Sequence, residues 1–295
     1  MSGGLAAAFG WGSAQAAVRM VIGFASIKVT AVLLGPSGIA LVGQVGNFLT
    51  LLQGTLGNAI QTAVNKITAQ EEGAAGQGQR KLWGTATRLA LGLAVVVGSG
   101  VALLSLPLAR SLLGREDLWP VFVLAGLVLP VTMLQLVLTG VLTGLRRFRQ
   151  IAFVNMGATM LGAVIFIGLT LAFGLIGGLA GTLLAVASAL LVTLLVLRGE
   201  GGLRIRDCFA HWRPELVRPI VAFYPMLLVH AAAEPATLLL VRDALIDSQG
   251  VALAGQWQAT LRLSNMFTMV LVTTLSMYAL PTLSAIGDAQ RFRST

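Results

Sequence analysis

Long apolar segments recur along the chain, and short polar or glycine-rich segments separate them. Eight of the apolar segments approach or exceed the roughly 20 residues that an α-helix needs to cross a bilayer. They are Leu5–Leu34, Ile39–Val64, Leu82–Leu106, Leu118–Leu142, Ile151–Phe173, Leu175–Leu197, Leu216–Val241 and Val251–Leu280. Only Gly174 separates the fifth segment from the sixth, so that boundary is the least well defined. The pattern predicts an all-α polytopic membrane protein with about eight transmembrane helices.

The second predicted helix carries a stripe of amides and glycine along one side. At roughly 100° per residue, the members of the stripe fall within about 60° of one another. They are Asn47, Gly54, Asn58, Gln61 and Asn65. A lipid-facing helix would not carry such a stripe, because a buried polar group without a partner costs on the order of 1 kcal/mol or more. The stripe therefore lines a polar cavity, or it joins neighbouring helices by hydrogen bonds.

Two cations lie inside the first predicted helix. Arg19 is near its middle, where ionisable groups usually mark a path for a substrate or an ion. The alternative for Arg19 is a structural ion pair. Lys28 lies nine positions further on, about 180° around the helix, so the two cations cannot share one face. Lys28 is also close enough to the helix end to reach the interface, and its role stays open.

Composition supports the membrane assignment and excludes several other classes. Of the 295 residues 56% are hydrophobic and 11% are charged, against about 25% charged in a typical soluble domain. The net charge of +9 is explained by basic loops, so we expect no nucleic-acid partner. The chain has one cysteine, Cys208, and no Walker sequence, metal-ligand spacing or nucleophile elbow. We therefore expect no metal, no cofactor and no enzymatic activity.

The basic residues alternate between the two sides of the predicted membrane. Loops after even-numbered helices carry most of the 20 lysines and arginines, including the cluster Arg146, Arg147 and Arg149. Loops after odd-numbered helices carry only Arg110, Arg115 and Arg242. Because cytoplasmic loops are enriched in Lys and Arg, this split places both termini in the cytoplasm. The arginine cluster itself fits a topology signal or contact with anionic lipids better than substrate recruitment.

An internal repeat suggests two lobes. Gly38–Gln44 returns 212 residues later as Gly250–Gln256, with five of seven positions identical, and each copy opens an even-numbered helix. If the second helix repeats as the eighth, the repeating unit is six helices, as in transporters built from two similar lobes. We therefore predict a six-helix lobe over residues 1–200. Residues 201–295 would hold a cytoplasmic connection and the first two helices of a second lobe, the rest of which we expect to be absent.

The last two predicted helices carry further polar residues. In the seventh, His230 and Glu234 are four residues apart, just before Pro235. Glu234 is the only acidic residue well inside any predicted span, so it either couples transport to a proton or sodium gradient or neutralises a buried arginine. In the eighth, Gln258, Arg262 and Asn265 share one face. Arg262 either complements Arg19 across the two lobes or pairs with a carboxylate such as Glu234.

Four short motifs indicate a family. The turn Gly35–Gly38, the segment Thr62–Gln70, the opening Gly255–Trp257 and the segment Tyr278–Ser284 together resemble the Wzx-type oligosaccharide flippases, which include translocases of O-antigen and of enterobacterial common antigen. The resemblance spans nearly the whole chain. It implies the multidrug/oligosaccharidyl-lipid/polysaccharide exporter (MOP) fold, with two six-helix lobes around a central cavity. Since these flippases have about twelve helices, it also implies that roughly the last four are missing.

The resemblance implies that the chain flips undecaprenyl-pyrophosphate-linked oligosaccharide from the cytoplasmic to the periplasmic leaflet of the bacterial inner membrane. A polysaccharide polymerase and a chain-length protein would be its partners, besides the bilayer. Arg suits such a cargo because its planar fork donates two parallel hydrogen bonds to phosphate. The predicted substrate-binding residues are Arg19, Lys28, Asn47, Asn58, Gln61, Asn65, Gln258, Arg262 and Asn265.

Three other functions stay open. A multidrug or toxic-compound exporter of the same fold would carry a cationic cargo, which the cations Arg19, Lys28 and Arg262 disfavour. A membrane glycosyltransferase would need clustered carboxylates at a membrane surface, and the available pairs flank no other catalytic group. A remnant that does not transport alone is the third alternative, since the second lobe is expected to be incomplete.

Overall fold

The computed structural model describes residues 2–70, 77–145, 147–199, 208–209 and 212–222, with a few single positions beyond them. Helix is the only regular structure in this part of the chain. The long helices are α1 (Ser2–Leu52), α2 (Asn58–Gln70), α3 (Gln77–Leu103), α5 (Trp119–Gly144) and α6 (Phe148–Gly199). The short elements are η1 (Gln53–Gly57), α4 (Ser105–Leu108), η2 (Ala109–Leu113), η3 (Glu116–Leu118), η5 (Pro214–Leu216) and α7 (Val217–Val221). The predicted all-α fold class is confirmed.

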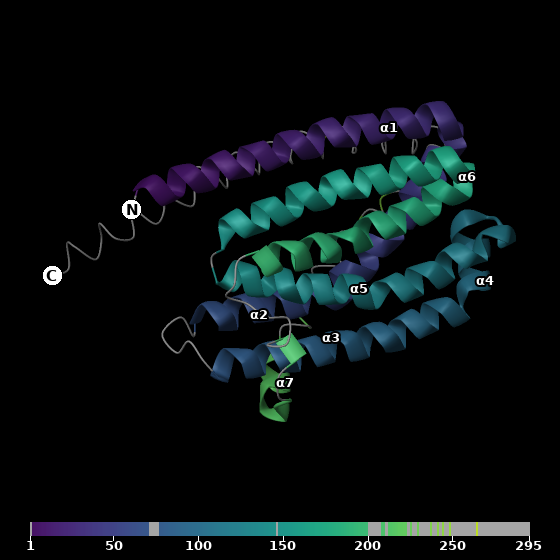
Figure 1. Ribbon diagram of the computed structural model, residues 1–295. Helices are drawn as coiled ribbons and strands as arrows, with labels where there is room; N and C mark the ends of the chain where they lie inside the picture. Colours follow the sequence, from purple (N-terminus) through teal and green to yellow (C-terminus); the bar gives the residue numbers. More distant parts are fainter. Residues whose placement is uncertain are drawn as a thin grey trace. The chain divides into compact units, whose positions relative to one another are not determined.

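Two glycines divide α1 and α6 into hairpins. Gly35 has φ 67° and ψ −172°, and Gly174 has φ 58° and ψ −131°, which are conformations that residues with a Cβ rarely adopt. The chain reverses at each glycine, and Figure 1 shows both reversals at the same end of the bundle. The apolar stretch Arg149–Arg198 has 50 residues, about 75 Å of helix, which is more than twice the hydrocarbon thickness. The turn at Gly174 therefore separates two crossings, at the boundary that the sequence predicts.

The second crossing is one long helix with a local π turn. The apolar stretch Ser37–Ala69 continues from α1 through η1 into α2, and η1 (Gln53–Gly57) has π geometry. A π turn accommodates an extra residue in an α-helix, and such turns are frequent at functional sites. The sequence pattern does not reveal it, because the apolar spacing continues on both sides.

The bundle is built around α5. This helix packs against α2, α3 and α6, while α1 packs against α6 (Figure 1). The burial of the candidate spans follows this arrangement: 56% of the most apolar window in Glu116–Gly144 is buried, against 6% in Val18–Gly35. The first half of α1 therefore lies at the edge of the bundle, where its remaining surface faces lipid or another part of the protein.

Glycines let the helices around α5 approach closely. A Cβ built on Gly98 of α3 would lie 2.5 Å from the carbonyl oxygen of Gly126 of α5. At the other end of α5, a Cβ on Gly140 would lie 2.8 Å from the carbonyl oxygen of Gln61 of α2. Small residues at such crossings are typical of membrane helix packing, because backbone contact replaces the hydrophobic driving force that lipid removes.

Residues 208–209 and 212–222, which follow α6 in the sequence, pack against α2 and α3. The side chains of Cys208 and Ile220 are 1% and 0% exposed and belong to the same apolar cluster as Leu82 of α3. Arg88 of α3 donates a hydrogen bond to the carbonyl oxygen of Phe209 at 3.4 Å. The backbone N–H of Arg213 donates to the hydroxyl oxygen of Thr85 at 3.1 Å. These contacts fasten the start of the connection to the bundle.

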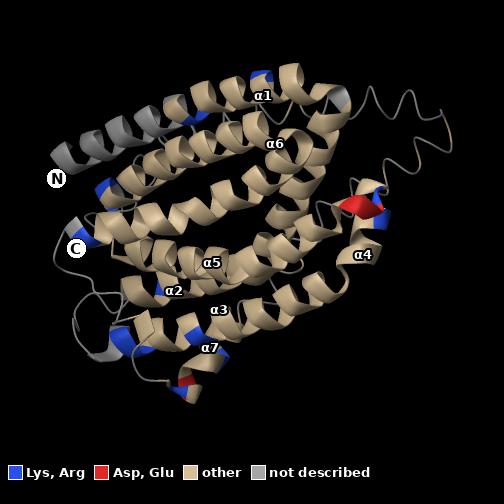
Figure 2. Ribbon diagram, turned by 45° about the vertical axis from the view of Figure 1, so that its right-hand side comes forward, with Lys and Arg blue, Asp and Glu red and all other residues tan. Residues whose placement is uncertain are grey.

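Charge differs between the two ends of the bundle (Figure 2). Most of the basic segments lie at the end near α2 and α7, where Glu215 of η5 is the acidic residue that the structure describes, whereas the segment beside α4 carries as many carboxylates as arginines. There Arg110 pairs with Glu116 at 2.9 Å and Arg115 with Asp117 at 2.6 Å. This asymmetry follows the predicted alternation of basic loops, and the orientation in the membrane stays a prediction.

Two compact units divide the chain, Met1–Ala231 and Ala232–Thr295. All the elements above belong to the first unit. Apart from α7 and single positions, the predicted seventh and eighth helices, Leu216–Val241 and Val251–Leu280, lie outside the described residues. The lobe boundary near residue 200 and the contents of the second lobe therefore stay predictions.

Candidate substrate-binding face

Arg19 lies on the exposed edge of the bundle, within a membrane-crossing helix. One turn further along, Ile22 lines a pocket together with Met160 and Ala163 of α6. The first crossing of α6 runs from Arg149 to Gly174, and Met160 is 11 residues from its start and 14 from its end. Because Ile22 lies beside Met160, Ile22 is also at about the middle of the crossing. Arg19 is three residues before Ile22, about 4.5 Å along the axis, and is therefore roughly 12 Å inside the end marked by Arg149.

Within the part of the chain that the structure describes, Arg19 forms no ion pair. The acidic residues of that part are Glu116, Asp117 and Glu215, and all three lie in short 3-10 turns outside α1 to α6. A structural ion pair for Arg19 therefore needs a partner such as Glu234, which lies outside the described residues. A cation at this depth without a neighbouring carboxylate has a strong preference for an anion.

Lys28 is exposed and points away from the pocket side of α1. It is six residues after Ile22, about 120° away from it around the helix axis, whereas Arg19 is about 60° from Ile22. Arg19 and Lys28 therefore serve different surfaces, as their spacing in the sequence predicts. Among the residues described, Lys28 also has no ion pair.

The amide stripe is open along most of its length. Asn47 and Asn58 are exposed, while Gln61 and Asn65 are partly buried where α2 crosses Gly140 and Gly144 of α5. In the described part of the chain, none of the four amide side chains bonds to another helix. The π turn of η1 lies between Asn47 and Asn58. The regular 100° per residue that predicted both side chains on one side of the helix therefore does not hold between them. Gly54 and Asn58 remain neighbours, since a Cβ on Gly54 would lie 3.9 Å from the Asn58 amide nitrogen.

The other predicted site residues belong to the predicted second lobe. His230, Glu234, Gln258, Arg262 and Asn265 all lie outside the described residues. Their roles in ion coupling and in substrate binding stay predictions.

The basic cluster after α5 is engaged locally. Arg147 donates to the Gln150 amide oxygen at 3.4 Å, and the guanidinium of Arg149 lies 5.8 Å from the centre of the Phe153 ring. Arg146 lies outside the described residues. These contacts hold Arg147 and Arg149 at the start of α6 and agree with a structural role for these two residues.

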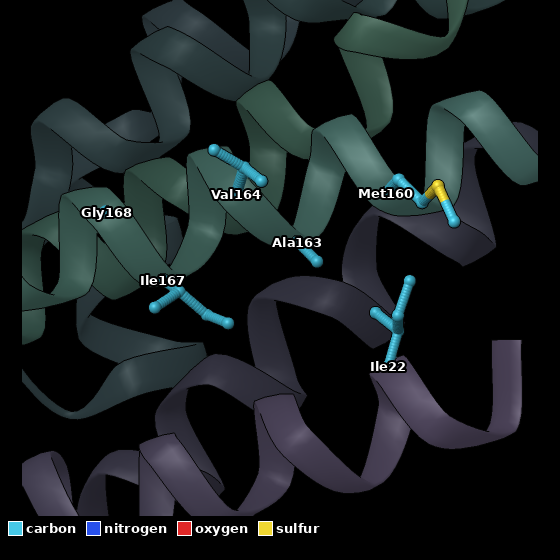
Figure 3. A pocket seen from close by; sticks show the side chains of 6 residues that line it. All are labelled: Ile22, Met160, Ala163, Val164, Ile167 and Gly168. Carbon is cyan, nitrogen blue, oxygen red and sulfur yellow. The ribbon is translucent and has the colours of Figure 1, made fainter. Parts of the chain in front are cut away.

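An apolar groove beside Arg19 was not predicted from the sequence. It has a volume of about 490 Å³ and lies between the first half of α1 and the first half of α6 (Figure 3). Its lining residues are Ile22, Met160, Ala163, Val164, Ile167 and Gly168. Figure 3 shows Ile22 pointing toward Met160, with Ala163 and Ile167 directed into the space between the helices. Apolar residues within long apolar segments give no signal that could have marked them.

Similarity to known proteins agrees with the predicted resemblance. The lipid III flippase of Escherichia coli (strain K12) is 24% identical over 290 residues, which cover 96% of this chain and 68% of the flippase. The lipid III flippase of Shigella flexneri has the same identity and coverage. The chain matches no family model. It thus spans about two thirds of the length of these flippases.

Solved transporters share the fold. An outward-facing multidrug resistance MATE family transporter of the MOP superfamily superposes with a TM-score of 0.60 at 18% identity, over 92% of this chain and 62% of that one. A MOP superfamily transporter from Pyrococcus furiosus, described as having a binding pocket of reverse polarity, gives a TM-score of 0.58 at 19% identity, over 92% and 61% of the two chains. The likeness to a flippase of the MOP superfamily is therefore confirmed, and the chain is a multi-pass membrane protein of that fold.

Proposed function

We propose that this chain takes part in moving a lipid-linked oligosaccharide with a diphosphate head from the cytoplasmic to the periplasmic leaflet of a bacterial inner membrane, by alternating access between two lobes. The observation that carries the proposal is the exposed guanidinium of Arg19 inside a membrane-crossing helix. No carboxylate lies beside it in the described helices. The similarity to lipid III flippases supports the same class of cargo.

The cargo explains why these residue types are needed. A diphosphate leaves water only if cations and hydrogen-bond donors replace its hydration, and Arg is always charged and donates through a planar fork. The open amides of Asn47, Asn58, Gln61 and Asn65 would contact the hydroxyls of the glycan. Lys28, on the other side of α1, would meet the head group at a different stage of the transport cycle.

The rest of the site belongs to the second lobe. Gln258, Arg262 and Asn265 would complete the cationic cavity, and Glu234 with His230 would couple transport to a proton or sodium gradient. Glu234→Gln with an unchanged protein level and unchanged flipping removes the coupling proposal. The specificity for an O-antigen-like or common-antigen-like glycan, and the association with a polymerase and a chain-length protein, also belong to this proposal.

Export of drugs or toxic compounds is the second candidate, because the solved MATE transporter has the same fold. A cationic cargo would need acidic residues in the cavity, because a cleft lined by one sign of charge attracts ligands of the opposite sign. In the described helices the cavity candidates are a cation and amides, so this structure favours an anionic cargo. Uptake assays with cationic dyes separate the two functions, since the flippase proposal expects no dye export.

The proposal is tested by complementation. The complete reading frame that contains this chain is expressed in a strain that lacks its lipid-linked oligosaccharide flippase, and surface glycan is scored. Restoration by the wild type, loss with Arg19→Gln and full activity with Arg198→Gln are expected. Arg198 is a matched control because it is an exposed arginine at the end of α6. Failure of the wild type to restore glycan in any flippase-deficient strain refutes the cargo assignment.

A further inference from the structure

We propose that the apolar groove between α1 and α6 holds the head-proximal part of the polyisoprenoid chain of the lipid carrier, while Arg19 binds its phosphate. The inference rests on the proposed function, and it adds a binding site for the lipid tail. The groove is the pocket lined by Ile22, Met160, Ala163, Val164, Ile167 and Gly168.

The chemistry of the groove selects a hydrocarbon. All six lining residues lack polar side-chain atoms, so no lining side chain can bond to a sugar or to ordered water (Figure 3). An engineered apolar cavity of about 150 Å³ accommodates one benzene ring, so a volume of about 490 Å³ has room for about three isoprene units. The remainder of a long polyisoprenoid chain would stay in the bilayer.

The charge beside the groove selects an anionic lipid. Arg19 is one turn from Ile22 and on the same side of α1, so its guanidinium can reach the end of the groove. Lys28 lies on the other side of α1 and cannot contribute there. A groove for hydrocarbon that ends at a cation matches an amphiphile with a phosphate directly attached to its chain.

The depth of the groove separates this carrier from ordinary phospholipids. Phospholipid phosphates lie outside the hydrocarbon region, which is about 30 Å thick. Arg19 lies roughly 12 Å inside the end of the bundle marked by Arg149, and the groove begins one turn beyond it, at about the middle of the crossing, and extends toward the end at Gly174. A phosphate at the level of the Arg19 backbone lies below the phospholipid head groups, as expected for a carrier lipid on its way between the leaflets.

Binding measurements on the purified full-length protein test the proposal. The probes are undecaprenyl phosphate, undecaprenol, which lacks the phosphate, and phosphatidylglycerol, an anionic phospholipid. Gly168→Leu fills the groove from a position where an added Cβ meets no atom within 4 Å, so the variant is expected to fold. Gly92→Leu is the matched control, because Gly92 of α3 is also exposed and also has open space around it.

Gly168→Leu is expected to weaken binding of both undecaprenyl probes at least tenfold, and Gly92→Leu to leave it unchanged. Arg19→Gln is expected to reduce the affinity for undecaprenyl phosphate to that for undecaprenol, without changing the latter. Unchanged binding in Gly168→Leu, or equal binding of phosphatidylglycerol, overturns the proposal.

The same variants separate this proposal from the proposed function. If Gly168→Leu binds and flips normally while the wild type restores surface glycan, the groove assignment fails and the function stands. If the probes bind as expected but the wild type restores no glycan, the lipid site stands and the transport function fails.

Discussion

The crossing of α3 and α5 provides a sharp test of the packing, because two glycines on α3 have opposite surroundings. A Cβ on Gly98 would lie 2.5 Å from the carbonyl oxygen of Gly126, whereas a Cβ on Gly100 meets no atom within 4 Å. Replacing either glycine by alanine gains up to about 1 kcal/mol of helix propensity. Only Gly98→Ala also forces two backbones apart, and overpacking of this kind costs about 1–3 kcal/mol.

The two alanine variants should therefore differ by about 1–3 kcal/mol in the free energy of unfolding, with Gly98→Ala the less stable. For a domain of this size, about 2 kcal/mol corresponds to a difference of roughly 4–8 °C in Tm. The assay is thermal unfolding of both purified variants in the same detergent, so that the effect of the detergent on Tm is the same for both. Equal Tm values for the two variants would refute the close approach of α3 and α5.

Three further predictions concern the connection, one buried hydrogen bond and the topology. Cys208 is 1% exposed, so its thiol should react slowly with a membrane-permeant maleimide. Ile220→Ala should accelerate this labelling, because it loosens the apolar cluster that covers Cys208. Rapid labelling of the wild type would contradict the packing of residues 208–222 against the bundle. Trp83→Phe removes the 3.0 Å hydrogen bond to the hydroxyl of Thr68 and should cost about 1 kcal/mol in thermal unfolding, whereas an unchanged Tm argues against that bond. A phosphatase fused after Gly114 should be active in the periplasm; activity only in the cytoplasm reverses the predicted orientation.

The fold could be predicted well because it depends on the length of the apolar segments and on the glycines at the turns between them. The reversals at Gly35 and Gly174 fall where the apolar segments are separated in the sequence. The π turn Gln53–Gly57 could not be predicted, since an inserted residue leaves the apolar pattern unchanged. The glycine contact between Gly98 and Gly126 was equally hidden, because glycine occurs throughout the chain and only the packing distinguishes these two.

The candidate site was predictable only in its polar members. A cation within an apolar helix is visible in the sequence, and so Arg19 was found, together with the amides of the second crossing. The groove beside Arg19 could not be found, because it arises where two apolar helices separate slightly, and no residue type marks such a gap. The predicted ion-coupling pair, His230 and Glu234, lies outside the described residues and stays a prediction.

The most direct test of the cationic path is a flipping assay on reconstituted vesicles with a fluorescent oligosaccharide linked to undecaprenyl diphosphate. Loss of hydrogen bonds to a charged group costs about 1.5–3 kcal/mol, so Arg19→Gln should slow flipping about 10- to 100-fold. Arg19→Lys should retain part of the rate, since it keeps the charge and loses the planar fork. A rate for Arg19→Gln within twofold of the wild type, at equal protein incorporation, would contradict the account.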